Sequence, residues 1–142
     1  MGVTIYANGG SRDFNAGYGG FFNLRKNIAF AWDKELGEHY AQMMRSLLGE
    51  AEQKAYNEKT NKILANDRFK DEDSDILDFL YASDCEGSIS HKTCKKIYDL
   101  IKNINFGDKI FTYAAYSDGK DYEHFKDFLL ECYKHRRKLR WD

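Results

Sequence analysis

The chain contains no proline in its 142 residues, where average usage of roughly 5% would place about seven. Proline ends or kinks helices, so helices here can run without interruption, and turns must be made by Gly, Asn and Asp. This feature favours a mainly helical fold. The length and the hydrophobic fraction of 42% predict a single globular domain over residues 1–142.

Charge and cysteine content limit the classes of function. Lys and Arg number 22 against 23 Asp and Glu, and a net charge of -1 argues against binding bulk nucleic acid through overall charge. No apolar run reaches the length of a membrane span, and an odd number of cysteines, three, fits a reducing compartment. We therefore expect a cytoplasmic protein with neither a membrane nor bulk nucleic acid as partner, and the oligomeric state stays open, a homo-oligomer included.

The first part of the chain predicts a strand and then two helices. Residues 3–7 (VTIYA) are rich in β-branched and aromatic side chains and end at a turn signal. An apolar helical periodicity predicts a helix over residues 21–36, interrupted by Gly37, and a second amphipathic stretch over residues 40–48. Residues 110–116 (IFTYAAY) have strand composition and can pair with residues 3–7, with a helical start at their alanine pair as the alternative.

The remaining segments predict further helices. Residues 50–66 favour a mostly polar surface helix, Asp73-Ser74 caps a short one, Ser90 is the natural N-cap of the next, and the last starts at about Asp121. Residues 83–90 (SDCEGSIS) indicate a turn. The predicted fold is therefore mainly α with a small β element (α+β), a single compact helical domain of five or six helices.

A glycine-rich segment at residues 17–26 (GYGGFFNLRK) is the first candidate site. Gly19 and Gly20 can bring backbone N–H groups close to an anion at a helix start, and Arg25 can then contact a phosphate. The segment matches neither a P-loop nor a G-x-G-x-x-G motif. The alternative is a tight turn with positive φ before a core helix.

The turn at residues 83–90 carries the second candidate site, in which Asp84 and Glu86 accept hydrogen bonds from a ribose or an amine. It resembles part of an EF-hand loop, but Ala82 and Thr93 stand where the first and last carboxylates belong, so no calcium site is predicted. The alternative is a structural turn whose acids satisfy backbone N–H groups.

The basic C-terminal segment, residues 134–141 (KHRRKLRW), is the third candidate site. Arg136, Arg137 and Arg140 can bind phosphate oxygens. Trp141, like Phe22 and Tyr113, is a candidate for stacking on a flat ligand. The alternative is a basic last helical turn that complements the helix dipole and pairs with the acidic residues 67–86.

Metal and cofactor chemistry are not predicted. No two cysteines have the CxxC spacing of a zinc site, so we expect no metal and no cofactor. His91 and nearby acids are the candidates for catalysis, but His91-Lys92-Thr93 is a single copy of the H-x-T motif, and two-histidine phosphoesterases need two.

The segments GYGGFFNLRK, SDCEGSISHKTCKKI and FLLECYKHRRKLRW together resemble an uncharacterised family of small phage and Gram-positive bacterial proteins. That family shares a YGGF-type start, an SDCEG-type turn before a helix, and a basic aromatic C-terminus. The resemblance implies a compact accessory protein of the host-takeover or anti-defence kind, and it transfers no reaction.

Together these features predict a non-enzymatic binding protein, a phage anti-defence sponge that sequesters a small phosphorylated ligand such as a nucleotide-type immune signal. Two alternatives stay open. One is a protein-interaction module that inhibits a host protein through its acidic segment or its basic tail. The other is a nucleotide phosphodiesterase in which His91 takes part in catalysis.

Overall fold

A computed structural model of the protein describes residues 3–9, 13–15, 17–43, 49–66, 69, 71–83, 85–104 and 120–142. Within these ranges the chain forms six α-helices and one small antiparallel sheet, so the predicted mainly α class with a small β element is confirmed. The elements are β1 (Thr4–Ala7), β2 (Asp13–Asn15), α1 (Gly17–Trp32), α2 (Lys34–Ala41), α3 (Glu50–Leu64), the 3-10 helix η2 (Asp71–Asp73), α4 (Ser74–Tyr81), β3 (Gly87–Ile89), α5 (His91–Ile101), α6 (Lys120–Lys134) and β4 (Leu139–Trp141).

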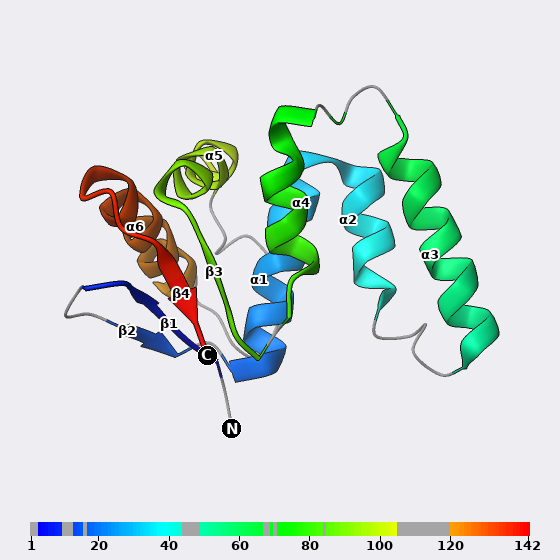
Figure 1. The fold of residues 1–142 in the computed structure, drawn as a ribbon, viewed down its shortest axis with the longest axis horizontal. Coiled ribbons are helices and arrows are strands. Elements are labelled where there is room, and N and C mark those ends of the chain that lie inside the picture. The colour runs from blue at the N-terminus through cyan, green and yellow to red at the C-terminus, as the bar shows by residue number, and fades with distance from the viewer. Residues whose placement is uncertain are drawn as a thin grey trace.

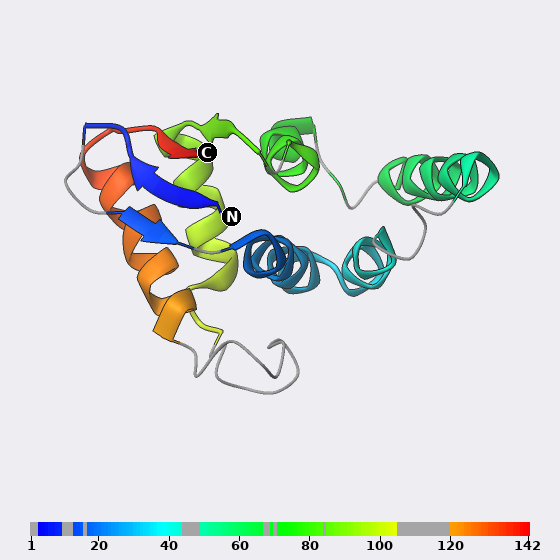
Figure 2. The same cartoon turned by 90° about the horizontal axis from the view of Figure 1, so that it is seen from below.

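The sheet and the helices lie side by side along the long axis of the molecule, in an order different from their order in the chain. The sheet, α5 and α6 occupy one end, α1 and α4 lie in the middle, and α2 and then α3 extend toward the other end (Figures 1 and 2). In α3, Tyr56 and Ile63 are buried while most of the other side chains are exposed. This confirms the prediction of a surface helix over residues 50–66.

The sheet has the strand order β2-β1-β4-β3. The predicted strand at residues 3–7 is confirmed, and its described partners are β2 and β4, with Ile5 opposite both Phe14 and Trp141. The predicted partner, residues 110–116, lies outside the described residues. The sequence did not predict three strands: Asp13–Asn15, Gly87–Ile89, which belongs to the segment predicted as a turn, and Leu139–Trp141, which belongs to the predicted basic helix end.

The core lies between the sheet and the helices. Trp141 is 1% exposed, and its ring packs on Phe21 and Phe79 at centroid distances of 5.5 and 5.4 Å. Its indole N–H donates to the backbone oxygen of Ser83 at 2.9 Å. Gly87 lies directly beneath the indole, since a Cβ there would come within 2.2 Å of the ring. The last strand is therefore fixed by its tryptophan.

The helix expected over residues 21–36 differs from the prediction at both ends, and α1 already begins at Gly17. It ends at Trp32, and α2 begins immediately with Asp33 as its N-cap, whose carboxylate accepts from the N–H of Leu36 at 2.9 Å. Gly37 lies inside α2 rather than at a break, and a Cβ there would clash with the ring of Phe30 at 2.4 Å. The glycine thus permits close packing of α1 on α2. Residues 44–48 of the second predicted stretch lie outside the described residues.

Candidate functional site

An open hollow of about 600 Å³ lies between the start of α5 and the end of α6. Its lining consists of His91, Lys92, Tyr133, Lys134 and Arg136. Lys92, Lys134 and Arg136 are exposed, and His91 is half-buried. The hollow is therefore bordered by three cations, a histidine and a tyrosine, from segments more than forty residues apart in sequence.

The start of α5 places His91 and Lys92 at this hollow. Ser90 is the N-cap, as predicted, with an extended backbone and a hydroxyl that accepts from the N–H of Thr93 at 3.3 Å. An N-cap side chain satisfies a free N–H group of the first helical turn, so the helix begins directly after it. His91 and Lys92 are therefore the first two residues of α5.

The end of α6 places Tyr133, Lys134 and Arg136. The N–H of Arg137 donates to the carbonyl of Cys132 at 2.9 Å, and the N–H of Arg136 donates to the carbonyl of Tyr133 at 3.2 Å. This pair of bonds is a Schellman motif, whose C′ residue has a left-handed backbone and is usually glycine. Here that residue is Arg136, with a φ of 53°. A side chain in this conformation is strained, and such strain clusters at functional sites.

The cations of the hollow lack the acidic partners found elsewhere on α5. Lys95 pairs with Asp99 at 3.0 Å, and Lys102 pairs with the same carboxylate at 3.4 Å. Among the described residues, by contrast, no acidic side chain forms an ion pair with Lys92, Lys134 or Arg136. Their positive charge is therefore available to an anion from solution.

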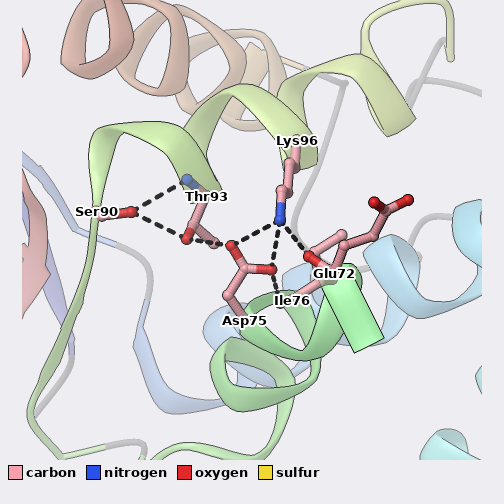
Figure 3. A network of polar contacts seen from close by, with 6 residues as sticks. All are labelled: Glu72, Asp75, Ile76, Ser90, Thr93 and Lys96. Carbon is pink, nitrogen blue, oxygen red and sulfur yellow. Dashed lines mark hydrogen bonds and ion pairs between the residues drawn. The ribbon is translucent and has the colours of Figure 1, made fainter. Parts of the chain in front are cut away.

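A polar network joins α5 to α4 and η2 (Figure 3). Asp75 accepts from the hydroxyl of Thr93 at 2.8 Å and from the ammonium of Lys96 at 3.0 Å, and Lys96 also donates to the backbone oxygen of Glu72. Burial alone would raise the pKa of Asp75, but the hydrogen bonds from Thr93 and Lys96 outweigh it and lower the pKa. These groups satisfy one another, so the network is a structural tie that holds α5 in place.

Of the described residues predicted from the basic tail, Arg136 alone lines the hollow. Arg137 is half-buried just beyond it. Arg140 is exposed on β4, opposite Tyr6 and Ser88, and therefore projects from the sheet. Trp141 is buried in the core, so stacking on a ligand is replaced by packing against the protein's own aromatic rings.

Arg25 also has a role different from the predicted phosphate contact. It is 5% exposed, and its guanidinium donates to the carbonyls of Ala82 at 2.7 Å and Phe79 at 3.2 Å. The group also lies 4.5 Å from the ring centroid of Phe21. Arg25 therefore connects α1 to the end of α4.

The other predicted site residues are spread over the molecule. Gly19 and Gly20 lie inside the first turn of α1, and among the described glycines the positive φ belongs to Gly9. Phe22 is half-buried and stacks on Tyr40 at a centroid distance of 5.4 Å. Glu86 is exposed just before β3. Asp84 and Tyr113 lie outside the described residues.

Four residues of the hollow were not assigned to ligand binding from the sequence: His91, Lys92, Tyr133 and Lys134. A signal for two of them existed, because Ser90 was recognised as an N-cap, and this fixes His91 and Lys92 in the first turn. That turn lies close to the end of α6 because of how α5 and α6 pack against each other. Local sequence patterns do not predict this packing.

None of the three cysteines lines the hollow as the structure describes it. Cys85 is exposed, whereas Cys94 and Cys132 are buried where α5 and α6 pack. A hydrogen bond with Cys132, together with burial, raises the pKa of Cys94. In the part of the chain that the structure describes, no three His, Cys, Asp or Glu side chains gather as a metal site would require.

Comparisons with known proteins add no relative: no protein-family model, no curated protein and no solved structure matches the chain. Among the described helices, none has the length and apolar composition that spanning a membrane requires.

Proposed function

We propose that the protein binds a small phosphorylated ligand in the hollow between α5 and α6 and holds it without chemical change. The observation that carries the proposal is the convergence of Lys92, Lys134 and Arg136 on one hollow, whose lining includes no acid among the residues that the structure describes. Arginine binds phosphate oxygens in pairs, and lysine contributes a compact charge. The three cations together form a receptor for an anion.

The size of the site favours a compact anion. A hollow of about 600 Å³ is within the range of small-molecule sites, whereas binding a nucleic-acid duplex requires many phosphates to be neutralised along an extended surface. Binding without turnover would let the protein act as a sponge for a nucleotide-type signal in the host cytoplasm, which fits the anti-defence kind of accessory protein that the sequence resemblance implies.

Hydrolysis is the second candidate function, because His91 also lines the hollow. General acid–base catalysis by histidine usually relies on a second group that orients the imidazole or activates water. Within the described lining no carboxylate is present for that task. The arrangement therefore supports binding more than phosphodiester cleavage.

The test is a calorimetric titration with inorganic tripolyphosphate at low salt. The wild-type protein should bind it, and Arg136→Ala should weaken binding at least tenfold, because a hydrogen bond to a charged group contributes about 1.5–3 kcal/mol. Arg140→Ala is the matched control, since it removes the same charge from the exposed face of the sheet, and should bind like the wild type.

Three outcomes would overturn the proposal. Equal losses in the two variants would mean that overall charge, not the hollow, attracts the ligand. A phosphodiester substrate recovered as cleaved product, with cleavage lost in His91→Ala, would establish the hydrolase. No binding of tripolyphosphate or of nucleotides would shift the assignment to a protein-interaction module.

A further inference from the structure

The hollow contains an aromatic ring in addition to its cations. Tyr133 is 40% exposed, and no other large hydrophobic side chain among the described residues is exposed. Tyr133 was not among the residues predicted to stack on a ligand. Of those that were, Phe22 and Trp141 lie in the described part of the chain, and both pack against rings of the protein itself. Tyr133 thus has a ring surface that the protein does not cover.

The position of Tyr133 is fixed relative to the cations. Its backbone carbonyl accepts from the N–H of Arg136 at 3.2 Å, so ring and guanidinium project from one helix end. Lys95 also lies close, with its ammonium 5.5 Å from the ring centroid of Tyr133 and 5.4 Å from that of Tyr98. Because Lys95 is itself held by Asp99 at 3.0 Å, this cation–π contact helps to hold the ring in place.

We infer that the ligand is a nucleotide, whose base stacks on Tyr133 while its phosphates bind Lys92, Lys134 and Arg136. A site that bound only inorganic phosphate would gain nothing from an exposed ring at its border. Nucleobases stack on exposed aromatic rings, and every base offers a face for this contact. The inference rests on the proposed binding of phosphate in the hollow and adds the chemical class of the ligand.

The experiment compares ATP with tripolyphosphate, which share the triphosphate group and differ by the nucleoside. Wild-type protein should bind ATP about fivefold or more tightly than tripolyphosphate, the smallest effect expected of one stacked base. Tyr133→Leu keeps an apolar side chain but removes the aromatic face, so it should abolish the preference for ATP over tripolyphosphate. Tyr133→Phe keeps the ring and should retain the preference.

The results separate this inference from the proposed function. Equal binding of ATP and tripolyphosphate by the wild type, or an unchanged preference in Tyr133→Leu, would overturn the stacking role while phosphate binding stands. Absence of binding by both compounds would overturn both. The thermal unfolding midpoint of each variant serves as the control for folding, and it should stay near that of the wild type because the ring is substantially exposed.

Discussion

Two groups of cations lie on or beside α5, and they differ in whether an acidic side chain pairs with them. Lys95, Lys96 and Lys102 have carboxylate partners in Asp75 and Asp99. At the start of the same helix, Lys92 lies with Lys134 and Arg136 around a hollow whose described lining includes no acid. The first group is neutralised within the protein and supports the fold. The second retains its charge, and like charges held together favour the binding of an anion.

Arg25 is another cation whose partners lie within the protein, here two backbone carbonyls, and its replacement should have the largest effect on stability. Arg25→Met keeps an apolar stem but leaves the carbonyls of Phe79 and Ala82 without their donor. The free energy of unfolding should fall by about 3 kcal/mol, because each buried acceptor left unpaired costs about 1–3 kcal/mol. Urea denaturation measures this loss. Affinity for tripolyphosphate, measured where the variant is folded, should not change, and a large loss of affinity would restore Arg25 to the binding site.

The double variant Lys92→Ala/Lys134→Ala tests the second group directly. Its affinity for tripolyphosphate should fall at least tenfold at low ionic strength, because each ammonium contributes a charge-assisted contact. The difference from the wild type should shrink at high salt, where exposed charges are screened. Calorimetric titration at two salt concentrations measures both effects. Unimpaired binding would show that these lysines do not face the ligand.

Asp75→Asn should remove the carboxylate partner of Lys96, and its effect on stability should be smaller than that of Arg25→Met. The ion pair with Lys96 is about one-third exposed, so solvent screening limits the expected loss of stability to about 1 kcal/mol. The pKa of Asp75 in the folded protein lies below its ordinary value of 3.8. Its carboxylate therefore stabilises the fold above that pH, and this contribution is lost as the pH falls through the folded-state pKa.

Denaturation curves between pH 3 and 7 test the pH dependence. The difference in stability between wild type and Asp75→Asn should be constant near neutrality and shrink toward the acid end. A constant difference over the whole range would mean that the charge of Asp75 does not contribute.

The sequence predicted elements whose signals are local. The Ser90 cap, the strand at residues 3–7 and the surface helix over residues 50–66 are all found. Arg25 could not be predicted in the same way, because its carbonyl partners lie 54 and 57 residues further along the chain. Only packing determines whether a long cationic side chain turns inward or outward.

The basic tail shows why the predicted site was only partly found. The sequence predicts one basic segment over residues 134–141, but the chain leaves the helix after Lys134 and forms β4 at Leu139–Trp141. The alternation of buried Leu139, exposed Arg140 and buried Trp141 was a weak strand signal. The helix end was harder to identify, because its left-handed residue is Arg136 in place of the usual glycine.

Arg136→Gly tests the central claim most directly, and the deciding measurement is its affinity for tripolyphosphate, with urea denaturation of the same sample as the control. Glycine relieves a left-handed strain of about 1–2 kcal/mol, offset by about 0.4–1 kcal/mol of added chain entropy. The variant should thus be more stable than the wild type by about 0.5–1 kcal/mol, yet bind at least tenfold more weakly. A more stable protein with unchanged affinity would contradict the account, because Arg136 would then serve neither the fold nor the ligand.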